Sequence, residues 1–511
     1  MLSFKLLLYL LSYCTCDIAE DLQHVLSTYK ADPNCVFNHT EVNSKTIKFF
    51  PNCSVIYGII SINENTDVSN AQLQKAFQNM TQIFGGIRIE NSKLTDLSIF
   101  TLDPVYNALR IVCTTYGVFI LNNNHLTSAE LLRDTFMYED KYGNECDVQI
   151  VNNSKLDTEG LCDARSLQYY TDMKIQGNLK DCGCVGGEIT ESSLPGLQNC
   201  TTLFRGLRIV NGTTITDLKS LSQIKTIRGE LEVYEVSGLQ NLSFLESLDK
   251  IRINNKMEWN KWSMNLYGNS ELRRLGLPYL RELSNTRDDS VQIASIWRNH
   301  PDFCLTIEEI SFFLEQKIFF AELDMKLCED NRTNTSTVNI CRFESMKRLA
   351  DDCGLIIGDV VINSGDEKLV NRLKALRYLF GSLVIQNTSL TTTEPISYIR
   401  YILHLNNSNP VIQVVGNKNL KNAYTSDVQH IITTGNRTAV FQDNHPSVFN
   451  YFNGTCEFLR NLYDNSSKYR NRLEYVGGDC GKPVDIVYWP SSEAGSFLFL
   501  SIFGLVLVTI L

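Results

Sequence analysis

Three stretches of this sequence repeat one pattern, in which Asn/Asp-Cys is followed after a few residues by a glycine and an apolar run. They are Asn52-Cys53 with Gly58-Ile59-Ile60-Ser61-Ile62-Asn63, Asn199-Cys200 with Gly206-Leu207-Arg208-Ile209-Val210-Asn211, and Asp352-Cys353 with Gly358-Asp359-Val360-Val361-Ile362-Asn363. The three cysteines lie 147 and 153 residues apart, which is the size of one domain. Each copy leads to a second glycine and strand, at residues 86–89, 229–233 and 381–385. Such similarity, of domains within the chain and of strands within a domain, is typical of stacked repeat units.

Within each copy the local pattern predicts parallel rungs of β-strand. Apolar and polar residues alternate in Ile87-Arg88-Ile89-Glu90, as expected for a strand with one face inward. Asparagine followed three residues later by leucine, as at 269–272 and 417–420, suits a turn that buries its next apolar side chain. Apolar residues at a spacing of three to four between Leu369 and Leu379 predict a helix between the cysteine strand and the glycine strand. The expected fold class is β-rich with short helices, in three tandem right-handed β-solenoids similar to leucine-rich repeats.

The N-terminus has the pattern of a secretory signal peptide. Lys5 is followed by the apolar run Leu6–Leu11, and small residues come at Cys14 and Cys16. We therefore predict a signal peptide at residues 1–16, which is removed in the mature protein.

The C-terminus predicts a membrane anchor. Residues 497–511 are uncharged and apolar, but 15 residues are short for a spanning helix, which needs about 20. Ser491 and Ser492 precede them as candidate attachment sites of a glycosylphosphatidylinositol anchor, with 481–496 as a juxtamembrane linker. A marginal tail-anchoring helix is the alternative. We expect the chain on the extracellular face of the plasma membrane, with a shed form as an alternative.

Composition agrees with a folded, glycosylated ectodomain. The chain is 43% hydrophobic and 20% charged, and its 511 residues suggest three domains. A net charge of −10 argues against nucleic acid and anionic membrane surfaces as partners. Fourteen Asn-x-Ser/Thr sequons are predicted glycosylation sites: Asn38, Asn52, Asn79, Asn152, Asn199, Asn211, Asn241, Asn331, Asn334, Asn387, Asn406, Asn436, Asn453 and Asn465.

The cysteines can be sorted by the repeat. Fourteen remain after the signal peptide, an even number in an oxidising compartment. Each domain opens with one pair and closes with another, which gives domains at 35–182, 184–328 and 341–480. Cys182-Gly183-Cys184 also fits a metal or redox site, but one of these cysteines closes a domain and the next opens another. The predicted disulfides are Cys35–Cys53, Cys113–Cys146, Cys162–Cys182, Cys184–Cys200, Cys304–Cys328, Cys341–Cys353 and Cys456–Cys480.

The opening cysteine pair, the two glycine strands, the Asn-x-x-Leu turns and a closing helix with cysteines together resemble the receptor L-domain. The resemblance covers residues 35–480 in three copies. It implies the ligand-binding module of insulin- and epidermal-growth-factor-type receptor ectodomains, and is most similar to the nematode expansions of such proteins. No furin-like cysteine-rich block separates the copies, and no kinase domain is present. The resemblance therefore implies peptide-hormone or growth-factor binding without catalytic output.

The sequence offers little to an enzyme. Its seven histidines are scattered, no pair has metal-ligand spacing, and P-loop, Gly-x-Ser-x-Gly and His-Glu-x-x-His motifs are absent. We therefore predict no catalytic residue, no metal site and no cofactor.

Two functions of different classes remain as hypotheses. The first is a cell-surface or secreted glycoprotein that binds a secreted insulin-like or EGF-like peptide or its receptor ectodomain, as a decoy or co-receptor. The alternative is a structural or adhesion protein that uses the solenoids for cell–cell or matrix contacts, with homodimerisation as an open possibility.

Outward side chains of the glycine strands are the candidate ligand-binding residues, because exposed sheet positions form the recognition surface of stacked repeats. Domain 3 offers Val384 and Gln386 with the Asn387 sequon beside them, so we expect it to be a spacer. Trp259 and Trp262 interrupt the strand pattern of domain 2, and tryptophan is enriched at binding hot spots, although a core position is the alternative. The predicted ligand-binding residues are Arg88, Glu90, Glu230, Glu232, Tyr234, Trp259 and Trp262.

Overall fold

The computed structural model describes residues 18–100, 102, 108–139, 146–162, 171–210, 218–253, 262–285, 292–328, 338–406, 408–423, 428–435, 437–449, 456 and 473–489. The predicted signal peptide, residues 1–16, and residues 490–511 lie outside this part of the chain. By contacts the chain divides into two compact units, one of residues 1–237, 242–265 and 276–290, the other of 238–241, 266–275 and 291–511. We keep the names domains 1, 2 and 3 for 35–182, 184–328 and 341–480.

Domain 1 is built on one seven-stranded sheet, in which every described pair of strands is parallel. The strand order is β1-β2-β3-β4-β6-β7, and β5 also pairs with β4. The α-helices described here are α2 (Ile18–Thr28) and α3 (Asn70–Phe77). The strands are β1 (Val36–Phe37), β2 (Val55–Ile62), β3 (Gln82–Glu90), β4 (Leu109–Leu121), β5 (Thr135–Glu139), β6 (Cys146–Val151) and β7 (Thr171–Gln176).

Domain 2 divides its strands between two main sheets, of orders β18-β16-β14-β12-β10-β8 and β15-β13-β11-β9, and a two-stranded β17-β19 ladder. Its helix is α5 (Ile307–Glu315). The strands are β8 (Gly187–Glu188), β9 (Thr202–Leu203), β10 (Leu207–Val210), β11 (Thr226–Arg228), β12 (Leu231–Tyr234), β13 (Lys250–Ile253), β14 (Met264–Tyr267), β15 (Glu282–Asn285), β16 (Ile293–Trp297), β17 (Cys304–Leu305), β18 (Phe319–Leu323) and β19 (Lys326–Leu327).

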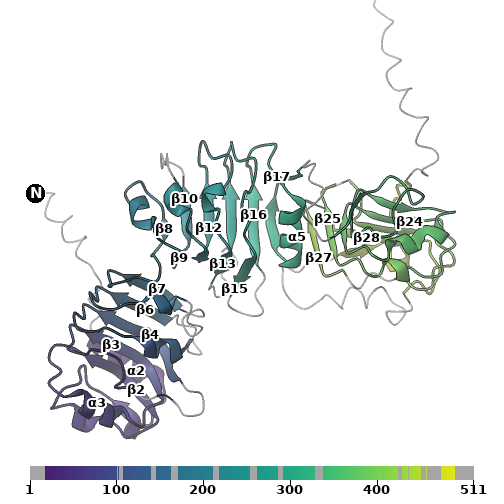
Figure 1. The fold of residues 1–511 in the computed structure, drawn as a ribbon. Coiled ribbons are helices and arrows are strands. Elements are labelled where there is room, and N and C mark those ends of the chain that lie inside the picture. Colours follow the sequence, from purple (N-terminus) through teal and green to yellow (C-terminus); the bar gives the residue numbers. More distant parts are fainter. Residues whose placement is uncertain are drawn as a thin grey trace, which may run out of the picture. The chain divides into compact units, whose positions relative to one another are not determined.

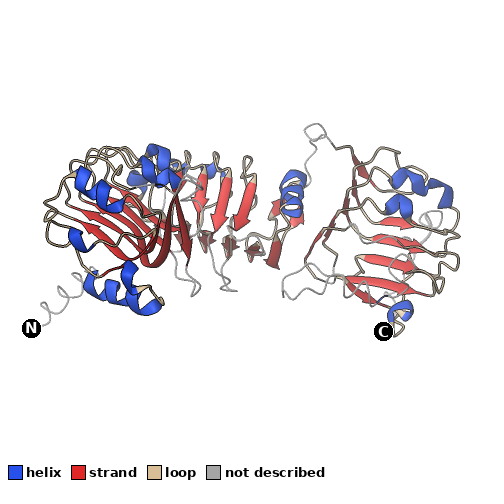
Figure 2. Cartoon of the chain, turned by 90° about the horizontal axis from the view of Figure 1, so that it is seen from below, coloured by secondary structure: helices blue, strands red, loops and turns tan. Residues whose placement is uncertain are grey.

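Domain 3 has two five-stranded parallel sheets, of orders β20-β21-β23-β25-β27 and β22-β24-β26-β28-β29. Figure 2 shows its strands stacked one above the next. They are β20 (Ile340–Arg342), β21 (Leu355–Ile357), β22 (Val360–Ile362), β23 (Tyr378–Phe380), β24 (Leu383–Gln386), β25 (Tyr401–His404), β26 (Ile412–Val415), β27 (His430–Thr433), β28 (Thr438–Gln442) and β29 (Glu474–Val476). The β-rich class with few helices and three repeats is therefore as predicted.

Glycines form a corner in the rungs, within the long strands β2 and β3 of domain 1 and between the two sheets of domain 3. Gly58 and Gly85 are partners in neighbouring strands and both have positive φ. A Cβ at Gly85 would lie 2.2 Å from the carbonyl oxygen of Gly58, so a side chain does not fit there. Gly381 has the same relation to the carbonyl oxygen of Gly358, at 2.3 Å. The second glycine of domain 1 is therefore Gly85, not Gly86 as the sequence pattern suggested.

Buried asparagines follow the strands and form a ladder along domain 3. The side chain of Asn417 is fully buried, and its Nδ2 donates to the carbonyl oxygens of Ile385 and Val415 at 3.0 and 3.1 Å. Its Nδ2 also donates to Oδ1 of Asn444, and its Oδ1 accepts from the Thr388 amide. Asn123 with Asn153 and Asn269 with Asn299 make equivalent bonds. The predicted Asn-x-x-Leu turn thus satisfies backbone groups that strand pairing leaves open.

Two helix predictions need correction. Among the described residues, only domain 1 has an α-helix, α3, between the cysteine strand and the glycine strand; it starts at a capping box of Ser69 and Gln72. The predicted helix in 369–379 is a 3₁₀ turn over Glu367–Leu373, because β23 already begins at Tyr378. The closing helix α5 lies between Cys304 and Cys328 and contains neither, since Thr306 caps its N-terminus.

The seven disulfides join the pairs expected from the repeat: Cys35–Cys53, Cys113–Cys146, Cys162–Cys182, Cys184–Cys200, Cys304–Cys328, Cys341–Cys353 and Cys456–Cys480. Cys182 and Cys184 belong to different bonds, so this run forms no dithiol site. Among the described residues, no group of His, Cys, Asp and Glu side chains could hold a metal ion.

Candidate functional site

The strands that follow the corner glycines present one comparable outer surface in each domain, which we call the front face. It consists of the outward side chains of β2–β4 after the corner in domain 1, of β10 and β12 in domain 2, and of β24, β26 and β28 in domain 3. Arg88 and Glu90 come three and five residues after the corner Gly85. Glu232 and Tyr234 hold the same places after Gly229, and Val384 and Gln386 hold them after Gly381. The pairs Arg88/Glu90, Glu232/Tyr234 and Val384/Gln386 therefore occupy equivalent positions in the three domains.

Helix α2 covers the front face of domain 1. Leu22 and Val25 of α2 form a buried cluster with Ile59 of β2 and Phe119 of β4, separate from the main core. Figure 1 shows α2 beside β2 and β3, in agreement with its contacts to these strands. The spacing of Ile18, Leu22, Val25 and Leu26 makes α2 amphipathic, so its apolar side lies on the sheet.

Arg88 and Glu90 pair with each other on this covered face. Arg88 Nη2 lies 2.6 Å from Glu90 Oε2, and their side chains are 22% and 28% exposed. A partner would have to compete with this ion pair and with α2. Their role in ligand binding stays a prediction, with less accessible surface than the sequence suggested.

The extended tail of the described chain covers the front face of domain 3. Gln386 Nε2 donates to the carbonyl oxygen of Trp489 at 2.7 Å, and Gln413 Nε2 donates to that of Val487 at 3.1 Å. Gln442 donates to the carbonyl oxygen of Val484 at 3.3 Å. The segment expected to be a juxtamembrane linker therefore lies, over residues 484–489, across three strands of domain 3.

The front face of domain 2 is open by comparison. Arg208 on β10 pairs with Glu232 on β12, with Nε 3.0 Å from Oε2, and the Arg208 side chain is 57% exposed. Glu188 faces Arg208 from the other neighbouring strand, and Tyr234 is 41% exposed beside Val210. In the part of the chain that the structure describes, β10 makes its extensive contacts with the strands β8 and β12, and no helix has comparable contacts with β10 or β12. A cation between two carboxylates, next to an exposed tyrosine, is a surface suited to a peptide partner.

The remaining predicted binding residues in domain 2 are not all brought to this face. Glu230 is half-buried beside the corner, where its carbonyl oxygen accepts from the Leu207 amide. Trp262 is half-buried two residues before the start of β14, and Trp259 lies outside the described residues. Glu232 and Tyr234 are therefore the predicted residues that the structure gathers with Arg208, which the sequence interpretation had not singled out.

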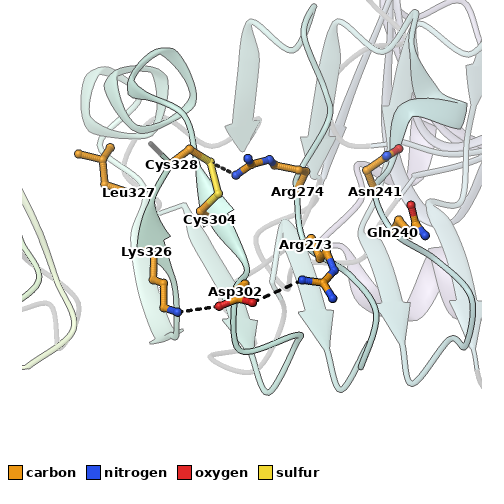
Figure 3. A pocket seen from close by; sticks show the side chains of 9 residues that line it. All are labelled: Gln240, Asn241, Arg273, Arg274, Asp302, Cys304, Lys326, Leu327 and Cys328. Carbon is orange, nitrogen blue, oxygen red and sulfur yellow. Dashed lines mark hydrogen bonds and ion pairs between the residues drawn. A yellow bond between two sulfur atoms is a disulfide. The ribbon is translucent and has the colours of Figure 1, made fainter. Parts of the chain in front are cut away.

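A pocket of about 510 Å³ lies at the closing end of domain 2, close to the Cys304–Cys328 disulfide. Figure 3 shows Asp302 between the cations Arg273 and Lys326, and Arg274 pointing to the disulfide. Lys326 Nζ lies 2.9 Å from Asp302 Oδ1, and Arg273 Nη1 lies 3.4 Å from Oδ2. The hydrogen bond from Lys326 lowers the pKa of Asp302, so the carboxylate stays ionised. Three cations against one carboxylate leave the pocket basic, and Asn241, a sequon, also lines it.

The predicted glycosylation sites that the structure describes lie at the surface. Asn38, Asn52, Asn79, Asn152, Asn199, Asn387 and Asn406 are exposed, and Asn241 is half-buried. Asn211, Asn331, Asn334, Asn436, Asn453 and Asn465 lie outside the described residues. The same holds for Ser491, Ser492 and the hydrophobic tail. No helix among the described residues is long and apolar enough to cross a bilayer.

A sequence profile of the receptor L domain matches residues 52–167, 199–316 and 352–453, more than half of the chain. The chain belongs to the receptor L domain family. The three matched segments are the three repeats, and each match ends near or before the closing cysteines. The resemblance that the cysteine and glycine spacing suggested is thus confirmed.

One protein with a similar sequence comes from Caenorhabditis elegans. The chain is similar to Protein irld-34, with 24% identity over 303 residues, which cover 55% of this chain and 72% of that protein. Family membership supports an extracellular location and ligand binding as the general kind of function, together with the seven disulfides.

Proposed function

We propose that this receptor L domain protein binds a secreted insulin-like or EGF-like peptide, or its receptor ectodomain, on the front face of domain 2. It would act as a decoy or co-receptor without catalytic activity. The observation that carries the proposal is the difference between the three front faces. The chain itself covers those of domains 1 and 3, whereas in domain 2 the side chain of Arg208 is 57% exposed and Tyr234 is 41% exposed.

The chemistry of this face supports a folded peptide with mixed charge. Arg208 and Glu232 are partly solvated, so their ion pair contributes little to stability and can be exchanged for pairs with a ligand. Tyr234 supplies a rigid aromatic surface, the residue type that most often carries binding energy at interfaces. The basic pocket beside Asp302 lies at the other end of the domain and would suit only a small anionic group.

The proposal also includes how the protein is displayed. We take each domain as a short right-handed solenoid, the chain as attached to the extracellular face of the plasma membrane by a lipid or a tail helix, and the described sequons as glycosylated. A structural or adhesive role, with homodimers formed through the solenoids, is the competing proposal. It predicts self-association and no selective capture of a small secreted peptide.

The test is capture of secreted peptides by cells that display the full-length chain, with mass spectrometry of what is retained. Tyr234→Ala should weaken binding of the captured peptide at least about tenfold, the effect of a hot-spot residue. Arg208→Glu should weaken binding to the same extent, because it reverses the charge. The double variant Arg208→Glu with Glu232→Arg restores an ion pair of opposite orientation, and it should not restore binding if the ligand contacts Arg208 directly. Lys225→Glu, exposed in the same domain outside β10 and β12, is the matched control. Equal binding by Tyr234→Ala, Arg208→Glu and the control would refute the proposed face.

A further inference from the structure

The front face of domain 3 binds the main chain of the tail through side chains, as a protein binds an extended peptide ligand. Gln386 uses both ends of its side-chain amide on one residue: Nε2 donates to the Trp489 carbonyl oxygen at 2.7 Å, and Oε1 accepts from the Trp489 amide at 3.2 Å. Gln442 does the same with Val484, at 3.3 and 2.9 Å. A side-chain amide that pairs with both main-chain groups of one residue reproduces the contact between two strands.

The glutamines are held in place by other bonds. Gln386 Nε2 also donates to Oδ1 of Asn363 at 2.8 Å, and Gln442 Oε1 also accepts from the Gly478 amide at 3.2 Å. With the tail in place, Gln386 and Gln413 are only 4% and 2% exposed. Side chains fixed in this way lose little conformational freedom when a peptide binds them.

Apolar side chains complete the surface between the glutamines. Val384, Val415 and Val440 are buried but do not belong to the core cluster of domain 3. Strand alternation places them on the outer face, because their neighbours Ile385, Val414 and Ala439 lie in the core. The tail crosses these strands, and Val484, Ile486 and Trp489 are each half-buried along it.

We propose that the front face of domain 3 is a binding site for an extended peptide with apolar side chains, and that residues 484–489 are its intramolecular occupant. Gln386, Gln413 and Gln442 form hydrogen bonds with the main-chain groups of the peptide. Its apolar side chains pack on the outward valines of β24, β26 and β28. The site is separate from the face proposed for domain 2, so failure of one leaves the other standing. While the tail is bound, domain 3 is closed to a peptide from another chain.

The tail can be released without altering the site. Proline lacks the backbone N–H, so Val484→Pro with Trp489→Pro removes the two bonds that these amides donate to Gln442 and Gln386. The glutamines and valines stay unchanged in this variant. Conversely, Gln386→Ala with Gln442→Ala releases the tail and removes the site. Gln429→Ala, an exposed glutamine of domain 3 outside this face, is the matched control.

Hydrogen exchange of the full-length protein measures occupation by the tail. The amides of Val484 and Trp489 should exchange at least about tenfold more slowly in the parent and in the Gln429→Ala control than in the double alanine variant. The proline variant has no amide hydrogen at these two positions, so release of its tail is measured by peptide binding. The probe for the site itself is a synthetic peptide of residues 482–489, titrated to about 1 mM because a tethered segment has an effective concentration of that order. It should bind the proline variant and neither the parent nor the double alanine variant. Unprotected tail amides in the parent, or equal peptide binding by the proline and alanine variants, would overturn the proposal.

Discussion

The asparagine ladder of domain 3 allows the cost of one side chain to be worked out from its bonds. We consider Asn417→Ala. The side chain of Asn417 donates from Nδ2 to the carbonyl oxygens of Ile385 and Val415, and its Oδ1 accepts from the backbone N–H of Thr388, all in a buried turn. Alanine leaves these groups without their partner, and an unsatisfied buried polar group costs about 1–3 kcal/mol. Since the alanine site is small and some groups can rearrange, we expect two of them to stay unsatisfied, which destabilises domain 3 by about 4 kcal/mol.

The assay must isolate domain 3, because a chain of several domains does not unfold in a single two-state step. Denaturant titration followed by hydrogen exchange and mass spectrometry reads the unfolding of peptides from 355–449 alone. Asn419→Ala is the matched control, since Asn419 is exposed two residues further along the same turn. A surface substitution of this kind should change the free energy of unfolding by less than about 0.5 kcal/mol. If Asn417→Ala lowered it by no more than the control, the ladder would not carry the structural role argued above.

Three further predictions concern pH, a disulfide and the anchor. Burial lowers the pKa of His430 to about 4, while its Nε2 bonds the Ile318 carbonyl oxygen. The free energy of unfolding that depends on neutral His430 is therefore fully present above about pH 6.5 and is lost as the pH falls toward 4, by up to about 3 kcal/mol. His430→Gln should remove this pH dependence of the free energy of unfolding, and an unchanged pH dependence would contradict the prediction. Replacing Cys304 and Cys328 by serine should destabilise the end of domain 2 by about 3 kcal/mol, and peptide mapping of the parent should find them linked to each other. Phosphatidylinositol-specific phospholipase should release the mature protein from cells, whereas retention with residues 497–511 still detectable would favour a membrane helix.

Much of the fold follows from local rules that the sequence displays directly. Apolar alternation identified the strands, and the cysteine repeat identified the disulfides, because both depend on residues close in sequence or on a repeated period. The corner in domain 1 was misplaced by one residue, since Gly85 and Gly86 are adjacent and only the positive φ of Gly85 distinguishes them. The helix before β23 was overestimated because its apolar spacing continues into the strand.

The coverings of the front faces could not be derived in the same way. Whether α2 lies on Ile59 and Phe119, or the tail on Gln386, depends on contacts between residues up to 103 apart in sequence. A signal was nevertheless present in the outward positions of the strands. Isoleucine and valine at such positions predict that something covers them, because exposed apolar patches are unfavourable. The alternation of inward apolar residues, which identifies the strands, does not contain this signal.

The outward positions explain how one fold can serve three purposes in a single chain. Ile59 and Phe119 in domain 1 offer an apolar surface, which suits the continuous apolar side of a helix. Gln386 with Val384 in domain 3 offers hydrogen bonds as well, which suits an extended segment whose main-chain groups need partners. Arg208 in domain 2 is solvated and needs no cover from its own chain, so this face can stay open in the free protein. A few outward residues therefore determine which segment covers a front face, while the buried strands beneath them follow the same pattern in each domain.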